Sequence, residues 1–436
     1  HTDIKFDPMS AGRQMGGHFV THSLDESFNW KNLMEQKNSS SDISPTAAQM
    51  PRLLGLAQAS KIYKELVGFD FSKFSNNGDE VAWGTIGNAS TSEGLFFEAF
   101  NAAGVLQIPL VISVWDDEYG ISVHNKYQTT KESISKVLKG FQRDKQDNGY
   151  EIITVNGWDY VELINTYEKA GQIAREKHIP VLIHVQELTQ PQGHSTSGSH
   201  ERYKNAERLE WEKKYDCNLI FRKWIIENNI ADENEINNLE IKIKSQVKEA
   251  KNSAWKDFIE PIIISKNQLK EILQKVAVRS NNGGLINKEI TYLDEIKEPL
   301  KKDVLSAARR ILKYVRADNN DVKLELINWI NYYSSKEQEK YSSLLYSESN
   351  IRSQNIESLD PVYDSESEMV DGRIIIRDNF DKILSKYPEV LIFGQDTGKI
   401  GGVNQGLEGL QAKYGSTRVS DSGIREATII GQAIGL

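Results

Sequence analysis

Two short polar stretches, each following an apolar run, hold the side chains in this sequence that are best suited to chemistry. GNASTSEG spans 87–94 and follows VAWGTI, and WDDEYG spans 115–120 at the end of PLVISVW. The carboxyl ends of parallel strands meet at one edge of a sheet, so Asn88 and Asp117 would bring two oxygen ligands together there. Mg²⁺ suits this arrangement, because it takes one or two protein oxygens and completes its octahedron with phosphate and water. The spacing is therefore consistent with a magnesium diphosphate site.

An ordinary structural explanation fits the same two stretches. Gly87 and Ala89 let a backbone or a ligand come close, but both stretches also resemble polar turns between a strand and a helix. In such turns Ser and Thr act as N-caps and carry no chemistry. From spacing alone both interpretations stay open.

The elements that would position these residues alternate between short apolar runs and segments of helical periodicity. Continuous apolar strands joined by helical crossovers predict a parallel sheet covered on both faces, which is α/β architecture. The expected strands lie at 80–87, 109–115, 150–157 and 179–188, and the expected helices at 93–106 and 159–177.

The second half of the chain changes character twice. Residues 203–345 carry Glu, Lys, Asn and Ile at helical spacing with a break at NNGG (281–284), and 347–368 have the composition of a polar linker. An α/β pattern then resumes, with a helix at 372–386, a strand at 389–396, a helix at 405–415, a short strand at 418–422 and a helix from Arg425. We therefore predict three regions, namely an α/β domain at 1–229, a helical connector and linker at 230–369, and the start of a second, truncated α/β domain at 370–436.

Composition excludes several classes of protein. The 53 basic and 62 acidic residues leave a formal charge of −9, which argues against a nucleic-acid partner. A single cysteine, Cys217, cannot form an internal disulfide, and neither a signal peptide nor a bilayer-spanning run is evident, so we expect a cytoplasmic protein without a membrane partner. The chain begins at His1 and stops in the apolar segment ATIIGQAIGL, so we expect a fragment of a longer protein.

Several motifs occur in an order that we know from one family. They are GRQMGGHF (12–19), ISPTAAQMP (43–51), GNASTSEG, FNAAG, WDDEYGIS, VNGWD (155–159) and GHSTSGSHERY (193–203). The chain resembles the thiamine-diphosphate-dependent first component of the 2-oxo acid dehydrogenase complexes, most closely the branched-chain type. The first region resembles its α subunit, and 370–436 resemble the start of its β subunit. The resemblance implies a thiamine-diphosphate-binding fold with both subunits fused in one polypeptide.

The resemblance assigns the metal ligands to Asn88, Asp117 and the backbone carbonyl of Tyr119. The family has Asp at the first position and Asn at the second, so the exchange is reciprocal and keeps one carboxylate and one amide oxygen. Trp115 stands where branched-chain members have a phosphate-binding Arg. Ala48 replaces a family Thr that binds a monovalent cation. The residues implied to bind the cofactor or that cation are Gly87, Ala89, Ser90, Ser44, Thr46 and Gln49.

Two residues are implied to be catalytic. Glu426 stands where the family's β-subunit Glu bonds the aminopyrimidine ring of the cofactor and drives its proton transfer. His194 stands in the loop whose His binds and protonates intermediates. The structural alternatives are a carboxylate favoured by the helix dipole for Glu426 and a solvated loop residue for His194. His18 is a weaker active-site candidate, and Ser195 or Ser197 is a weak candidate for phosphorylation.

The function implied is oxidative decarboxylation of a 2-oxo acid, for example the branched-chain 3-methyl-2-oxobutanoate, with transfer of the acyl group to a lipoyl domain of the acyltransferase component. The fused chain is expected to form a homodimer and to use thiamine diphosphate, magnesium and a monovalent cation. Two alternatives stay open. One is another thiamine enzyme, such as a pyruvate or acetoin dehydrogenase or a transketolase-like enzyme. The other is a non-catalytic paralogue acting as a scaffold, which Asn88 favours and Asp117 opposes.

Overall fold

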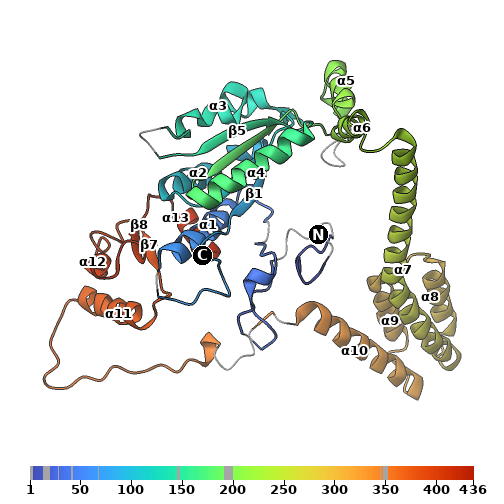
Figure 1. Ribbon diagram of the computed structural model, residues 1–436. Coiled ribbons are helices and arrows are strands. Elements are labelled where there is room, and N and C mark those ends of the chain that lie inside the picture. Colours follow the sequence, from blue (N-terminus) through green and yellow to red (C-terminus); the bar gives the residue numbers. More distant parts are fainter. Residues whose placement is uncertain are drawn as a thin grey trace. The chain divides into compact units, whose positions relative to one another are not determined.

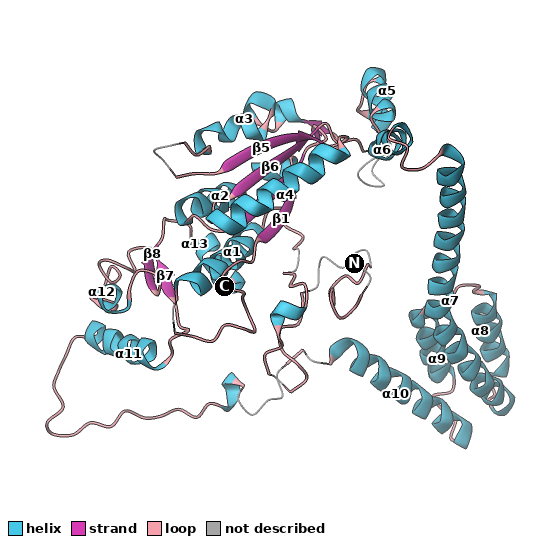
Figure 2. Cartoon of the chain, viewed as in Figure 1, coloured by secondary structure: helices cyan, strands magenta, loops and turns pink. Residues whose placement is uncertain are grey.

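The structure, a computed structural model, describes residues 3–12, 20–27, 29–40, 43–66, 68–144, 148–190, 200–343, 345–346 and 352–436 (Figures 1 and 2). The chain divides into two compact units, one comprising 1–230 and 368–436 and the other 231–367. The helices of the first unit are α1 (Met50–Glu65), α2 (Gly94–Leu106), α3 (Ile134–Val137), α4 (Tyr160–Lys177), α5 (Ala206–Lys214), α6 (Cys217–Glu227), α11 (Gly372–Lys386), α12 (Leu410–Tyr414) and α13 (Glu426–Gly435).

The centre of the first unit is a four-stranded parallel sheet with the strand order β1-β2-β6-β5. Gly87 at the end of β1 lies opposite Trp115 at the end of β2, and Trp115 lies opposite Val185 of β6. These strands therefore end at one edge, as the sequence predicts. The strands are β1 (Ala82–Gly87), β2 (Leu110–Trp115), β5 (Glu151–Asn156) and β6 (Val181–Gln186).

Helices cover both faces of this sheet. Because successive strand residues point to opposite faces, Leu110, Ile112 and Val114 of β2 join a core with α1 and α2, whereas Val111 joins a core with α4. Figure 2 shows the sheet as magenta arrows among these helices. The layered α/β class predicted from the apolar runs is confirmed.

The residues after 368 form a second, smaller α/β segment in the same unit. Strand β7 (Ile392–Gly394) pairs in parallel with β8 (Val419–Asp421). The helix expected over 405–415 is confined to α12, because Gly409 takes a left-handed backbone conformation (φ 79°) that a helix does not continue through. The chain then enters α13, which begins one residue after the predicted start at Arg425.

Helix α13 packs directly on α1. A Cβ added to Gly55 of α1 would lie 2.1 Å from the carbonyl oxygen of Gln432, so the two backbones touch where a side chain would not fit. Gln432 also donates a hydrogen bond to the side chain of Gln58, and Thr428 donates one of 2.6 Å to Glu98 of α2. The segment that resembles a β subunit is thus held to the α-like segment by polar and close-packed contacts.

The second unit is helical, as predicted. Its 47-residue helix α7 (Glu233–Arg279) begins with a capping box formed by Asp232 and Glu235, and it ends just before the NNGG break. The C-terminal half of α7 packs around an apolar core with α8 (Gly283–Glu295), α9 (Lys301–Tyr314) and α10 (Asp321–Ser342).

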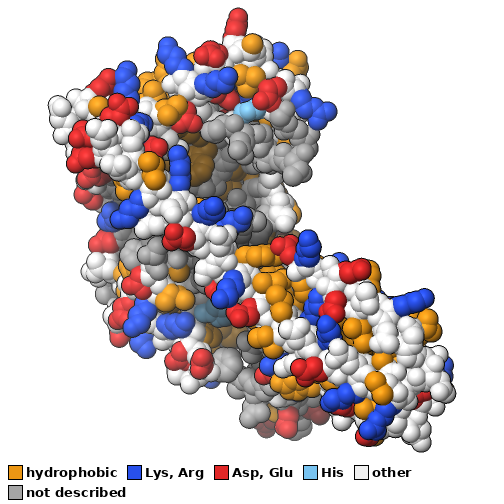
Figure 3. Space-filling view, turned by 90° about the vertical axis from the view of Figure 1, so that its right-hand side faces the viewer, with side chains coloured by type: hydrophobic (Ala, Val, Ile, Leu, Met, Phe, Trp, Pro, Cys, Tyr) orange, Lys and Arg blue, Asp and Glu red, His pale blue; other side chains and the backbone are white. Residues whose placement is uncertain are grey.

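One face of the molecule illustrates how its charged side chains are distributed. On the face drawn in Figure 3, basic and acidic side chains are interspersed, with clusters of apolar side chains between them. Within the described part of the chain, none of the helices is long and apolar enough to cross a membrane.

Candidate active site at the carboxyl edge of the parallel sheet

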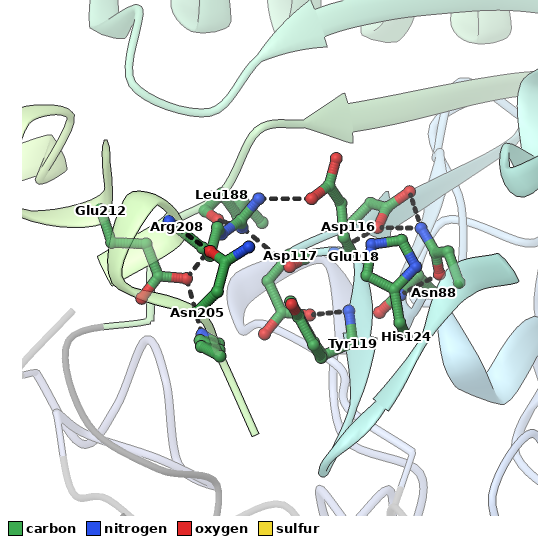
Figure 4. A network of polar contacts seen from close by, with 12 residues as sticks. Asn88, Asp116, Asp117, Glu118, Tyr119, His124, Leu188, Asn205, Arg208 and Glu212 are labelled. Atoms are coloured by element: carbon green, nitrogen blue, oxygen red, sulfur yellow. Dashed lines mark hydrogen bonds and ion pairs between the residues drawn. The ribbon is translucent and has the colours of Figure 1, made fainter. Parts of the chain in front are cut away.

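The two polar stretches meet at the edge of the sheet. Asn88 directly follows β1, and its backbone N–H donates a hydrogen bond of 3.0 Å to the carbonyl of Trp115. The backbone N–H of Asp116 in turn donates one of 2.9 Å to Val185 at the end of β6. After Asn88 a 3₁₀ turn (Ala89–Ser92) leads into α2. The loops that carry Asn88 and Asp117 are therefore fixed side by side (Figure 4).

The Asn88 side chain is buried and held from one side. Its Nδ2 donates a 2.8 Å hydrogen bond to Oδ1 of Asn125, whose own Nδ2 donates to Asp116 at 3.1 Å. His184 contacts the other oxygen of Asp116 at 2.9 Å. Among the described residues, no hydrogen-bond donor reaches Oδ1 of Asn88, so that oxygen is available to a ligand.

The Asp117 carboxylate is only partly solvated. One of its oxygens accepts a 3.1 Å hydrogen bond from the backbone N–H of Tyr119, which begins the short strand β3 (Tyr119–Gly120), paired with β4 (Val123–His124). Burial raises the pKa of Asp117, an effect that the Tyr119 hydrogen bond and the charge of Lys204 partly offset. A desolvated carboxylate with this little compensation is suited to a metal cation, which would favour its charged form.

An ion-pair cluster at the start of α5 holds the Asp117 loop. Glu212, Arg208 and Lys204 are four residues apart, and Oε1 of Glu212 accepts from Lys204 Nζ at 2.6 Å and from Arg208 Nε at 3.0 Å. Arg208 also donates to the Asp117 carbonyl at 2.9 Å and to the Glu118 carboxylate. Figure 4 shows Arg208 reaching from α5 to this loop. Sequence reasoning missed the cluster, although the four-residue spacing was its visible signal.

The 43–51 segment lies beside the same turn. Thr46 donates a 3.0 Å hydrogen bond to Glu93, which directly precedes α2. Oε1 of Gln49 is buried and has no hydrogen-bond partner among the described residues. A Cβ added to Gly87 would meet nothing within 4 Å, so space remains in front of the strand end. Ser44 is exposed in the turn before α1, whereas Ala89 and Ser90 lie in the 3₁₀ turn.

Of the two predicted catalytic residues, the structure describes Glu426 but not His194. Glu426 is the first residue of α13 and is exposed, and hydrogen bonds from its own backbone N–H and from the Gln395 side chain lower its pKa. Thr428, two residues further on, contacts α2, the helix that follows the Asn88 turn. His194 lies outside the described residues, as do His18, Ser195 and Ser197.

The donors at this edge fit a hard cation and its anionic ligand. Oδ1 of Asn88 and the desolvated carboxylate of Asp117 are oxygens, which is the ligand type that Mg²⁺ prefers. The Gln49 side chain has a further unpartnered oxygen, Oε1, in the segment beside this turn. Within the described ranges, no group of three or more His, Cys, Asp or Glu residues is placed to hold a metal. A metal here would therefore depend on amide and backbone oxygens as well as a carboxylate.

Comparison with known proteins defines the class. Residues 21–262, more than half of the chain, match the Dehydrogenase E1 component family, and residues 368–436 match the Transketolase, pyrimidine binding domain family. The chain belongs to the dehydrogenase E1 component family. The resemblance inferred from the motifs, including the joining of an α-like and a β-like segment in one chain, is confirmed.

Individual relatives include both branched-chain and pyruvate enzymes. The 2-oxoisovalerate dehydrogenase subunit alpha of Bacillus subtilis (strain 168) is 30% identical over 252 residues, which is 57% of this chain and 65% of the relative. The pyruvate dehydrogenase E1 component subunit alpha of Rickettsia bellii (strain RML369-C) is 27% identical over 42% of this chain and 53% of the relative. The mitochondrial 2-oxoisovalerate dehydrogenase subunit alpha 1 of Arabidopsis thaliana is 27% identical over 61% and 49%. The chain thus spans about half the length of the curated relatives it matches.

Proposed function

We propose that the protein catalyses oxidative decarboxylation of a 2-oxo acid, using thiamine diphosphate and Mg²⁺, and passes the acyl group to a lipoyl domain of an acyltransferase partner. The observation that carries this proposal is the meeting of Asn88 and Asp117 at the carboxyl edge of the sheet, within a segment that belongs to the dehydrogenase E1 component family. The unpartnered Oδ1 of Asn88 and the desolvated carboxylate of Asp117 at that edge support a metal there.

The substrate that we propose is a branched-chain 2-oxo acid such as 3-methyl-2-oxobutanoate. Support comes from the Bacillus and Arabidopsis relatives, whose names specify 2-oxoisovalerate. Pyruvate is the second candidate, because the Rickettsia relatives are pyruvate dehydrogenase subunits at similar identity.

Each residue has a defined task in this proposal. Asn88, Asp117 and the Tyr119 carbonyl hold the metal, and the cofactor, when bound, supplies the carbanion and the electron sink for decarboxylation. Glu426 would form a hydrogen bond to the aminopyrimidine ring of the cofactor and drive its proton transfer, and hydrogen bonds from its own backbone N–H and from the Gln395 side chain lower its pKa. His194 would stand beside the cofactor, where it would help to bind the substrate and supply a proton.

The two halves of the site are proposed to act in one polypeptide. Helix α13, which begins at Glu426, packs on α1 and contacts α2 of the same compact unit, which supports an intrachain pairing of the α-like and β-like segments. We propose that two such chains then associate as a homodimer. Light scattering on the full-length protein tests this, since a particle of one chain mass would contradict the dimer.

The deciding experiment measures 2-oxo acid-dependent reduction of an artificial electron acceptor by the full-length protein, with and without thiamine diphosphate and Mg²⁺. We expect cofactor-dependent activity, higher with 3-methyl-2-oxobutanoate than with pyruvate. Folded protein that lacks activity and shows no metal-dependent cofactor binding by calorimetry would favour the scaffold alternative.

A single substitution tests the role of Glu426. Glu426→Gln should lower turnover roughly 10²- to 10⁴-fold, which is the usual loss for a proton-transfer group. Glu233→Gln is the matched control, because Glu233 is likewise the first residue of a helix, α7, and has no proposed catalytic task. Near-normal turnover of Glu426→Gln would remove Glu426 from the mechanism.

A further inference from the structure

Four buried side chains form a continuous hydrogen-bonded chain that starts at the proposed metal edge and leads into the sheet. Asn88 contacts Asn125 at 2.8 Å, Asn125 contacts Asp116 at 3.1 Å, and Asp116 contacts His184 at 2.9 Å. Their exposed fractions are 5%, 3%, 5% and 0%, respectively, so water does not compete for these bonds. Figure 4 shows Asn88 and Asp116 on neighbouring loops of this edge.

The donors and acceptors in this chain permit only one orientation of the two amides. The Asp116 carboxylate offers only acceptors, and it receives the backbone N–H of Glu118 at 2.8 Å as well as Asn125 and His184. Asn125 must therefore turn its NH₂ group toward Asp116, which leaves its oxygen facing Asn88. Asn88 must in turn present its NH₂ group to that oxygen, so its own Oδ1 points away from Asn125.

We propose that Asp116 is a positioning residue that acts through Asn125 to aim the Asn88 oxygen at the metal, without touching the metal itself. This inference rests on the proposed function, since it takes Asn88 as a metal ligand. It also accounts for the amide at position 88. A carboxylate there would place an acceptor against the Asn125 oxygen, at the position where a 2.8 Å hydrogen bond now forms.

Restoring a carboxylate at position 88 provides the sharpest test. Asn88→Asp alone should place two acceptors in contact, because Asp116 still fixes the orientation of Asn125. In the double variant Asn88→Asp with Asp116→Asn, Asn125 is free to turn over, donate to position 88 and accept from position 116. The double variant should therefore bind metal more tightly than Asn88→Asp alone.

The expected increase in metal affinity is opposite to the change that simple electrostatics predicts. Removing the negative charge of Asp116 near a cation site should weaken cation binding if charge alone matters. An unsatisfied buried polar group costs about 1–3 kcal/mol, so relieving the mismatch should improve binding roughly 5- to 150-fold. Asp159→Asn is the control for the electrostatic contribution, because it removes a charge that follows β5 of the same sheet. Asn at this position can still cap α4.

The probe is Mn²⁺, titrated into the full-length protein with thiamine diphosphate and followed by the electron paramagnetic resonance signal of the free ion. In the wild-type background, Asp116→Asn and the near-isosteric Asn125→Leu should each weaken Mn²⁺ binding, and circular dichroism reports whether each variant folds. The comparison of Asn88→Asp, Asp116→Asn and the double variant leaves Asn125 unchanged. It therefore decides the proposal even if Asn125→Leu does not fold.

The outcomes separate the two proposals. Tighter Mn²⁺ binding by the double variant than by Asn88→Asp, with little change in Asp159→Asn, would support the positioning role. If Asp116→Asn weakens binding equally with Asn or Asp at position 88, the positioning role is overturned while the metal site stands. If the wild-type protein binds no Mn²⁺ in the presence of the cofactor, the proposed function fails and this inference fails with it.

Discussion

Replacing Gly55 by Ala would test whether α13 docks on α1 as the structure shows. The new Cβ would lie 2.1 Å from the Gln432 carbonyl oxygen and 2.8 Å from the backbone nitrogen of Leu436. Both neighbours are backbone atoms, one in α13 and one in its C-cap residue, so no side-chain rotation relieves the overlap. The helices must move apart locally by about 1 Å to reach the shortest separation that Cβ atoms adopt, which is close to 3.0 Å.

The energetic cost follows from three contributions. Overpacking of this kind costs about 1–3 kcal/mol, and separation of the helices breaks the buried hydrogen bond from Gln432 to Gln58, which contributes about 1 kcal/mol. Ala is about 1 kcal/mol better than Gly in a helix interior, and this offsets part of the loss. We therefore expect the docking of α13 to weaken by about 2 kcal/mol.

Hydrogen exchange read by mass spectrometry measures this docking locally, whereas global unfolding of a protein with two compact units does not isolate it. A loss of about 2 kcal/mol should speed amide exchange in 426–435 by roughly 30-fold. Gly104→Ala is the matched control, since it is also inside a helix but its Cβ would lie 3.4 Å from the Tyr150 ring, an ordinary contact. Equal protection of α13 in the two variants would refute the close packing of α13 on α1.

Two further predictions concern the stability of the fold and not ligand binding. Lys204→Met leaves Glu212 buried with one cation partner fewer and should destabilise the protein by about 3 kcal/mol in denaturant unfolding. Lys213→Met, at an exposed position of α5, should change the stability little. Burial lowers the pKa of His178 in the folded protein. As the pH falls, this His is therefore protonated in the unfolded chain before it is protonated in the folded one. Protonation then favours the unfolded chain, so the folded protein should lose stability as the pH falls below about 6.5. His178→Asn, which suits the left-handed backbone there (φ 50°), should therefore lose less thermal stability than the wild type between pH 7.5 and pH 5, and an equal loss would show that His178 does not contribute.

Local patterns in the sequence predict the fold well, because each element is encoded by neighbouring residues. The apolar run at 109–115 becomes β2 (Leu110–Trp115), and the periodic segment at 159–177 becomes α4 (Tyr160–Lys177). Buried parallel strands have apolar residues on both faces, so their sequence differs plainly from that of amphipathic helices. Predictions are poorer near the C-terminal segment, where glycines such as Gly409 shorten elements whose composition alone suggests a longer helix.

The sequence predicts only those residues of the site that lie within its motifs. Asn88 and Asp117 are placed correctly at one edge, because the ends of parallel strands determine that edge. Asn125 and His184 could not be found, since the first lies 37 residues from its partner Asn88 and the second 68 residues from its partner Asp116. Neither belongs to a spacing pattern, and only the tertiary structure brings them together.

The buried surroundings of Asn88 bear on whether this protein has lost a metal site. Taken alone, an amide in place of a metal-binding carboxylate favours a scaffold. In this structure, however, the neighbour of Asn88 is an acceptor, the Asn125 oxygen, which is held in that orientation by Asp116. A carboxylate at position 88 would leave two acceptors in contact, whereas the amide satisfies its neighbour and still offers one oxygen outward. The amide is the group that this environment requires, so the exchange is better explained by a rebuilt set of hydrogen bonds than by decay of the site.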